Sequence, residues 1–143
     1  MFSKILTFGI GALALVQGAL AIAPGRYIIR NREMGTLVSI GGGQPLSLSR
    51  SPFPAPVGQW NVEKSGQDEY TIINDDVAVL AYENTLFAGN RIDNFSIEDA
   101  GNDLLVIRAT DSNRVWTAAN DDATVHLEDD EGSNSQRWVF VPL

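Results

Sequence analysis

Short runs of alternating apolar and polar residues recur along this chain. The last of them, residues 136–141, places Trp138 and Phe140 on one face, as a half-buried β-strand should. Equivalent runs begin at Trp60 and Phe95, and the spacings between Trp60, Phe95 and Trp138 are 35 and 43 residues. A strand pattern that recurs at this interval predicts an architecture built from repeated units.

A second strand pattern repeats in step with the first. It centres on Ile29, Ile72 and Ile107, which are separated by 43 and then 35 residues. Two patterns with matching intervals indicate three copies of one unit. The copies extend over about residues 24–66, 67–101 and 102–143.

Each copy contains four short strand patterns separated by turn residues, and none shows a convincing helical period of 3.6 residues. Twelve strands in three four-stranded repeats predict an all-β fold, a β-trefoil, in which hairpins cap a closed barrel with pseudo-threefold symmetry. A β-sandwich would satisfy the strand count but gives no reason for a threefold repeat. The predicted strands are residues 26–30, 36–40, 46–48, 59–63, 69–73, 78–82, 85–88, 94–98, 103–108, 115–118, 123–127 and 136–141.

The predicted core follows from the inward positions of these strands. Apolar side chains at alternate positions should meet inside the barrel. The predicted core residues are Tyr27, Ile29, Trp60, Val62, Tyr70, Ile72, Phe95, Ile97, Leu105, Ile107, Trp138 and Phe140.

The first residues have the pattern of a secretion signal. A basic start at Lys4 is followed by an uncharged apolar run, and Ala19 and Ala21 form a small-x-small cleavage site. We therefore expect residues 1–21 to be a signal peptide and residues 22–143 to be a single secreted, extracellular domain. An uncleaved membrane anchor is the alternative, but the apolar run is short for a membrane span.

The composition narrows the classes of function. The chain has no cysteine, which excludes disulfides, thiolate metal sites and thiol nucleophiles. Its formal net charge of −8 at pH 7 gives a surface that repels nucleic acid and anionic lipid. We expect a monomer without cofactor or metal that binds neither nucleic acid nor membrane.

Catalysis is not expected from this sequence. Its one histidine, His126, falls on a predicted strand beside an acidic run, and no nucleophile-elbow pattern accompanies it. The acidic run, residues 128–131, could attract Ca²⁺ through its oxygens but lacks the spaced ligands of a dedicated calcium loop. A solvated acidic turn is the preferred interpretation.

With the repeats placed, the sequence resembles two related groups of secreted fungal proteins. Residues 24–31 (PGRYIIRN) look like the first strand of both mushroom ricin-B-type lectins and mushroom β-trefoil serine-protease inhibitors. Residues 84–88 (NTLFA), 95–97 (FSI) and 115–117 (VWT) are more similar to the inhibitors. The resemblance covers the whole mature chain, mostly at core positions. It implies a β-trefoil fold and a non-enzymatic binding function carried by surface loops.

The inhibitor resemblance implies a reactive loop in the first unit and a secreted serine protease as the partner. Residues 41–45 lie where the inhibitors carry this loop, which makes Gly43, Gln44 and Pro45 candidate contacts. A loop that is already held extended binds tightly because little entropy is lost on docking. Three glycines, however, would make this segment flexible by itself.

A second candidate for the reactive loop follows in the same unit. Arg50 and Ser51 begin a proline-rich segment, and a basic side chain there would suit a trypsin-like pocket that contains a carboxylate. An ordinary surface loop is the alternative for both segments. The turn at residues 82–85 is the next candidate.

The lectin resemblance implies a glycan partner and a sugar site in the third unit. Such sites combine an acid, an aromatic platform, an Asn and a Gln-x-Trp motif, because polar groups bond the hydroxyls while a ring covers the apolar sugar face. The third unit offers Asp111, Asn134 and Gln136, but Glu128 stands where the platform is expected. A purely structural role for Gln136 and Trp138 is the alternative.

Residues 94–96 (Asn-Phe-Ser) form an N-glycosylation sequon. Since Phe95 is predicted to be in the core, a glycan on Asn94 requires that this residue lie at the edge of its strand.

Overall fold

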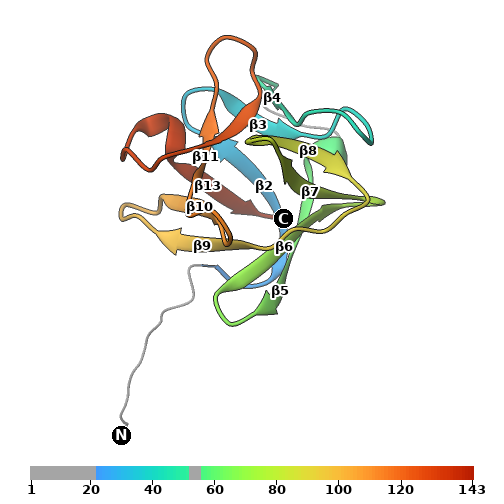
Figure 1. Cartoon of the computed structure of the whole chain (residues 1–143), viewed down its shortest axis with the longest axis horizontal. Coiled ribbons are helices and arrows are strands. Elements are labelled where there is room, and N and C mark those ends of the chain that lie inside the picture. The colour runs from blue at the N-terminus through green and yellow to red at the C-terminus, as the bar shows by residue number, and fades with distance from the viewer. Residues whose placement is uncertain (1–21, 52–55) are drawn as a thin grey trace, which may run out of the picture.

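A computed structural model describes residues 22–51 and 56–143 of the chain (Figure 1). The predicted signal peptide and residues 52–55 of the proline-rich segment lie outside the described residues. Within the described part, no helix is long and apolar enough to cross a membrane.

The strands are β2 (Gly25–Asn31), β3 (Gly35–Val38), β4 (Ser47–Ser49), β5 (Trp60–Gly66), β6 (Glu69–Asn74), β7 (Val77–Tyr82), β8 (Thr85–Gly89), β9 (Phe95–Asp99), β10 (Leu105–Ala109), β11 (Val115–Ala118), β12 (Val125–Glu128) and β13 (Trp138–Pro142). Two 3₁₀ helices, η1 (Pro56–Gly58) and η2 (Asn134–Gln136), complete the described elements.

Each of the twelve predicted strands corresponds to an observed strand, with ends that shift by a few residues. Two differences have a clear local cause. β3 ends at Val38, earlier than predicted, because the amide of Ser39 donates to the carbonyl of Val57 and the chain leaves the sheet. Gln136 belongs to η2 and not to the last strand, which begins at Trp138, because its amide donates to the Ser133 carbonyl and forms a turn.

Six strands pair successively in a closed ring. β2 pairs with β5, β5 with β6, β6 with β9, β9 with β10, β10 with β13, and β13 returns to β2, all antiparallel. Each of these strands therefore has a partner on both sides, which removes the open edges of a flat sheet (Figure 1).

The other six strands form three hairpins, β3–β4, β7–β8 and β11–β12. Backbone hydrogen bonds join the hairpins to one another: Leu46 N to the Leu86 carbonyl (3.0 Å), Leu48 N to the Ala123 carbonyl (2.8 Å), and Leu127 N to the Asn84 carbonyl (2.8 Å). A closed ring with three mutually bonded hairpins is consistent with the predicted β-trefoil. The division of the sequence into three repeats stays a prediction.

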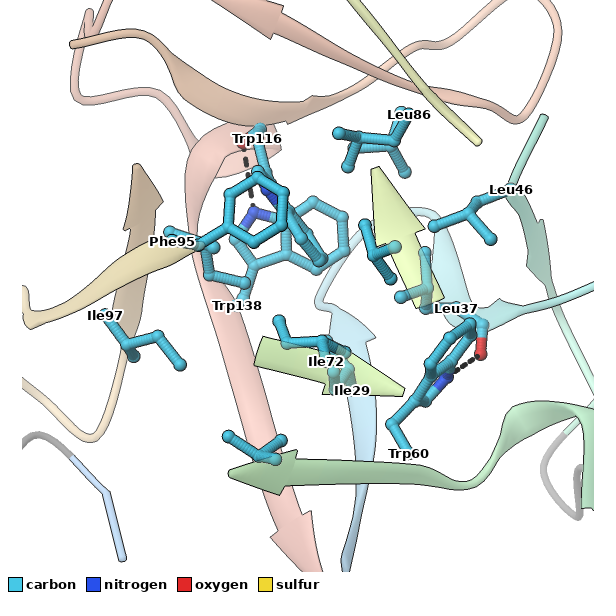
Figure 2. Close-up of a cluster of buried hydrophobic side chains, with 14 of the residues drawn as sticks. Ile29, Leu37, Leu46, Trp60, Ile72, Leu86, Phe95, Ile97, Trp116 and Trp138 are labelled. Carbon is cyan, nitrogen blue, oxygen red and sulfur yellow. Dashed lines mark hydrogen bonds between the residues drawn. The ribbon is translucent and has the colours of Figure 1, made fainter. Parts of the chain in front are cut away.

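The core confirms the predicted inward positions. Eleven of the twelve predicted residues are buried, and Phe140 is half-buried with its ring edge-on to Tyr27 at a centroid distance of 5.7 Å. Trp116, which the strand pattern did not mark as core, is fully buried. Figure 2 shows Phe95, Trp116 and Trp138 gathered together, with Trp60 elsewhere in the cluster.

Two buried asparagines hold the chain where it enters a barrel strand. Asn31, at the end of β2, donates to three backbone carbonyls in and beside η2, each at 3.2 Å. Asn74, at the end of β6, donates to the carbonyl of Pro56 in η1 and to the carbonyl of Gln59 just after it, both at 2.8 Å. A buried Asn side-chain amide therefore holds the segment before β13, and another holds the segment before β5. The two asparagines orient the loops at this end of the barrel.

Candidate functional site

The loop at residues 41–45 is hydrogen-bonded to strand β8. The amide of Gly43 donates to the Ala88 carbonyl (2.6 Å), and the amide of Ala88 donates to the Gln44 carbonyl (3.0 Å). Pro45 continues this pairing as an isolated bridge opposite Phe87. Three glycines would leave the segment flexible by themselves, but these bonds to a neighbouring hairpin hold its backbone in one conformation.

The glycines of the loop have different roles. Gly41 and Gly43 have φ angles of +136° and +81°, in the region that favours glycine. Gly42 has no such angle, and a Cβ there would lie 3.7 Å from Cγ1 of Val77, an ordinary contact. The turn therefore requires glycine on both sides of Gly42 but not at Gly42 itself.

Two hollows flank the loop. The first, called here the apolar cleft, has a volume of about 500 Å³ and a largely apolar lining that includes Gly42, Gly43, Val77, Leu80, Tyr82 and Phe87. The second, called here the side hollow, has about 550 Å³ and is lined among others by Ile40, Gly42, Val57, Asp75, Asp76 and Val77. Gly42 lies in the lining of both, and the side chain of Gln44 is exposed beside them.

Exposed apolar side chains concentrate around this loop. Ile40 is 62% exposed, Tyr82 is 58% exposed and Val57 is 46% exposed, and all three line one of the two hollows. The Tyr82 ring also stands edge-on to Phe87, with centroids 6.4 Å apart. Aromatic and branched apolar residues grouped around a fixed loop are typical of protein-binding surfaces.

The charge beside the loop is negative. Asp75 and Asp76 form the turn between β6 and β7, and Asp76 lines both hollows. Among the described residues that line the hollows there is no Lys, Arg or His. A cationic group on a partner would therefore be attracted to this face.

The second predicted contact segment lies at the end of β4. Arg50 and Ser51 are both exposed, and the Ser51 amide donates to Oγ of Ser49 at 3.1 Å. The Arg50 guanidinium makes no hydrogen bond or ion pair within residues 22–51 and 56–143. Arg50 lines neither the apolar cleft nor the side hollow, so the structure does not join it to the loop at residues 41–45 in one site.

The residues predicted for a sugar site have different surroundings. Asp111 is exposed and lines a polar cleft of about 420 Å³ together with Arg91, Asp93, Asn94 and Thr110. Asn134 and Gln136 are not part of that cleft. The side-chain amide of Asn134 donates instead to Oε2 of Glu33 at 3.3 Å.

Gln136 is directed into the protein and is 1% exposed. Its Nε2 donates to the Asp129 carbonyl (2.7 Å) and to Oγ1 of Thr117 (3.1 Å), and its Oε1 accepts from the Glu131 amide (2.8 Å). The amide is thus engaged in holding the loop before β13. This geometry matches the structural alternative for Gln136.

The acidic run after β12 is paired with arginines. Arg108 contacts Asp130 (3.2 Å) and also Glu98 on the neighbouring strand (3.0 Å), and Arg137 lies 3.8 Å from Asp130. Arg114 lies 3.6 Å from Asp129. A solvated acidic turn is therefore an incomplete description, because part of the run belongs to an ion-pair network. Within the described residues, no group of His, Asp or Glu is arranged to hold a metal ion.

This network shifts the pKa values of two carboxyls. The hydrogen bond from Arg108 lowers the pKa of Glu98 despite partial burial, which acts in the opposite direction. Burial also opposes ionisation of Asp130, but the Gly132 amide and the guanidinium groups of Arg108 and Arg137 outweigh it, and the pKa of Asp130 is lowered.

His126 lies on β12, as predicted, and both ring nitrogens contact threonine hydroxyls. Nδ1 is 3.1 Å from Oγ1 of Thr85, and Nε2 is 2.9 Å from Oγ1 of Thr124. The Thr124 hydroxyl also donates to Asp122 and is the main cause of the lowered pKa of that carboxyl. The contact with Thr85 joins strands β8 and β12.

Asn94 is exposed and immediately precedes β9. Its Oδ1 accepts a hydrogen bond from Oγ of Ser65 at 2.7 Å, while Phe95 is fully buried. The residue therefore lies outside its strand, where a glycan would not disturb the ladder. Glycosylation at this position stays a prediction.

No family model matches the sequence, and no curated protein matches it. Among solved structures, the chain is similar to the designed 3-fold symmetric protein ThreeFoil (17% identity, 83% of this chain and 99% of that chain, TM-score 0.74). It is also similar to the Rhizoctonia solani agglutinin (15% identity, 87% and 99%, TM-score 0.75) and to a proteinase inhibitor from Coprinopsis cinerea (17% identity, 85% and 99%, TM-score 0.67). These similarities support the β-trefoil fold. Because an agglutinin and an inhibitor share it, the fold alone selects neither function.

Proposed function

We propose that this protein is a secreted, monomeric, non-enzymatic binding protein that blocks a serine protease through the loop at residues 41–45. The observation that supports this function best is that backbone hydrogen bonds hold the loop on β8, beside exposed apolar side chains. The resemblance of the second and third units to mushroom inhibitors favours the same class.

The loop would act as a poor substrate held in place. Because Gly43 and Gln44 are bonded to Ala88, little conformational entropy remains to be lost on docking. The exposed side chain of Gln44 is available to enter a protease pocket, while Ile40 and Tyr82 would contact the surrounding surface. A stable interface of this kind buries about 1,600 Å², and a few anchor residues supply most of its energy.

Arg50 provides a second way to inhibit a protease. Its exposed guanidinium would suit the carboxylate of a trypsin-like pocket. In that case Arg50 and Ser51 form the reactive segment, and the loop at residues 41–45 contributes less to binding.

Inhibition assays against a panel of serine proteases test the proposal. The purified mature protein should inhibit at least one member, and either Gln44→Ala or Arg50→Ala should weaken that inhibition by at least tenfold, as expected for loss of a dominant contact. Glu63→Ala on β5 is the matched control and should inhibit as the parent does. Absence of inhibition at micromolar concentration against every member would refute the function. Inhibition unchanged in both loop variants would refute the assignment of the loop.

Carbohydrate binding is the second candidate function. The polar cleft that contains Asp111 favours it, because Arg91, Asp93, Asn94 and Thr110 offer both donors and acceptors for hydroxyl groups. A glycan array with a defined sugar signal that Asp111→Ala removes without loss of folding would establish this function in place of inhibition. A signal that persists in Asp111→Ala would exclude this cleft as the sugar site.

A further inference from the structure

We propose that the apolar cleft receives an aromatic or branched apolar side chain from a protein partner, and that Asp75 and Asp76 pair with a Lys or Arg next to that side chain. This inference deepens the proposed function and rests on it, because Gly42 and Gly43 of the same loop form part of the cleft. It specifies the chemistry that the partner must present.

The cleft has the size and lining for one large apolar group. Its volume of about 500 Å³ falls within the range of known ligand pockets, about 300–1,000 Å³. Gly42, Gly43 and Gly89 contribute no side chains to it, while Leu80 and Phe87 provide apolar surface. A single aromatic side chain can bury about 150–250 Å² in such a space.

Tyr82 gives the cleft an aromatic rim. The residue is 58% exposed, and its ring makes an edge-on contact with Phe87. A large aromatic residue left exposed beside a hollow is typical of an interaction site, since covering it removes apolar surface from water. The ring face can also attract a cation at close range.

The carboxylates beside the cleft determine the charge of the partner. Asp75 and Asp76 are exposed, and neither carboxylate makes a hydrogen bond or ion pair with another described residue. Together with the net charge of −8, they attract a basic group and disfavour an acidic one.

Charge also decides between a protein partner and a second copy of this chain. A symmetric dimer through this face would bring two pairs of carboxylates together, without a lysine, arginine or histidine among the described lining residues to neutralise them. A sugar would meet only Asp76, Asn90 and the Tyr82 hydroxyl as polar groups in the cleft, which is few for a molecule rich in hydroxyls. A basic and apolar protein segment fits both the lining and the charge.

Capped tripeptide amides provide a direct probe of the cleft. The ¹⁵N-labelled protein is titrated with Lys-Phe-Arg, with Lys-Ala-Arg and with Glu-Phe-Glu while amide shifts are followed by NMR. Lys-Phe-Arg should shift the amides of Gly42, Gly43 and Gly89. Removal of the aromatic ring should weaken binding by about tenfold or more, as expected for loss of a buried apolar side chain. Equal binding of the acidic peptide, or no shift of these amides at millimolar Lys-Phe-Arg, would overturn the inference.

Variants of the cleft separate its apolar and charged parts. Gly42→Phe adds a ring at a position that lines the cleft and needs no positive φ, and it should abolish binding. Gly66→Phe on β5 is the matched control and should bind normally. Asp76→Asn should weaken binding by about two- to fivefold, the usual effect of one exposed ion pair. If Gly42→Phe folds poorly, Tyr82→Ser provides an independent test of the aromatic rim. Unchanged peptide binding in both Gly42→Phe and Tyr82→Ser would exclude the cleft.

Protease assays distinguish this inference from the proposed function. If the basic peptide binds in the cleft but no protease is inhibited, the cleft is established and the inhibitor function fails. If a protease is inhibited equally by the parent and by folded Gly42→Phe and Tyr82→Ser, the function stands and the cleft fails. Self-association that Gly42→Phe removes, measured by sedimentation, would assign the face to a second copy and overturn the inference.

Discussion

Trp138 donates its indole N–H to the backbone carbonyl of Trp116 at 3.1 Å, and the two rings meet edge to face with their centroids 5.9 Å apart. Trp60 makes the same kind of bond to the Leu37 carbonyl at 3.0 Å (Figure 2). In both cases the first residue of a barrel strand is bonded to the first strand of a hairpin, β11 for Trp138 and β3 for Trp60. The tryptophans therefore connect the barrel to its hairpins as well as filling the core.

Truncation of Trp138 tests this connection. Trp138→Ala should lower the free energy of unfolding by about 3–5 kcal/mol, because a fully buried ring is lost and a cavity remains. Chemical denaturation followed by circular dichroism measures the change. A loss smaller than about 1 kcal/mol would contradict the observed burial.

The two contacting tryptophans should differ in their tolerance of phenylalanine. Within the described part of the chain, Nε1 of Trp116 has no hydrogen-bond partner, whereas Nε1 of Trp138 is bonded. Trp116→Phe removes a donor that has no partner. Trp138→Phe instead removes the hydrogen bond from the indole of Trp138 to the buried carbonyl of Trp116. We expect Trp138→Phe to be more destabilising by about 1–3 kcal/mol in parallel urea titrations. The reverse order would refute this account.

Gly35 should be far less replaceable than Gly42. Gly35 has a φ of +117°, and a Cβ there would overlap the carbonyl oxygen of Ser49. Gly35→Ala should therefore cost at least about 1–3 kcal/mol, since both the backbone conformation and the contact become strained. Gly42→Ala is the matched control and should change the free energy of unfolding by less than about 1 kcal/mol. Equal losses in thermal denaturation would argue against the described turn geometry.

Stability should fall at acidic pH through Glu98 and Asp130. Both carboxyls have lowered pKa values in the folded protein, so their contribution is complete above their ordinary values of 4.5 and 3.8 and is lost as the pH falls through the lower folded values. Denaturation midpoints measured from pH 6 downward, roughly to pH 2, follow this loss. Arg108→Gln should flatten the decline, because it removes the main partner of Glu98. Lys64→Gln is the control, and an equal flattening there would disprove the role of Arg108.

Asn94 should carry a glycan after expression in a eukaryotic secretory host. Its exposure just before β9 leaves room for the modification. Intact mass should show a glycan on the parent protein and none on Asn94→Gln. Ser96→Thr, which preserves the sequon, should keep it. An unmodified parent protein would contradict the prediction.

Strand positions could be predicted from the sequence because burial of one face imposes a period of two on apolar residues. Trp60, Phe95 and Trp138 follow this period, and each proved to be fully buried. The pattern carries no information on η1 and η2, because these short turns depend on the side-chain amides of Asn74 and Asn31.

The candidate site could be predicted only in part. The position of the loop came from a resemblance, but its rigidity depends on bonds between Gly43 or Gln44 and Ala88, which local sequence does not encode. The apolar cleft could not be predicted for the same reason, because the loop and the β7–β8 hairpin meet only in the folded chain. The inward direction of Gln136 likewise depends on Thr117, in a different strand.

The bonds between the loop and β8 also determine what a cut in the loop would do. Hydrolysis after Gln44, whose side chain is proposed to enter the protease pocket, would leave the Gln44 carboxylate beside the Ala88 amide and the Leu46 amide bonded to the Leu86 carbonyl. Both new chain ends would stay on strand β8 and close to each other, so neither fragment would be free to diffuse away. A nicked molecule would keep its shape and, under the proposed function, the bound protease could reseal the broken peptide bond.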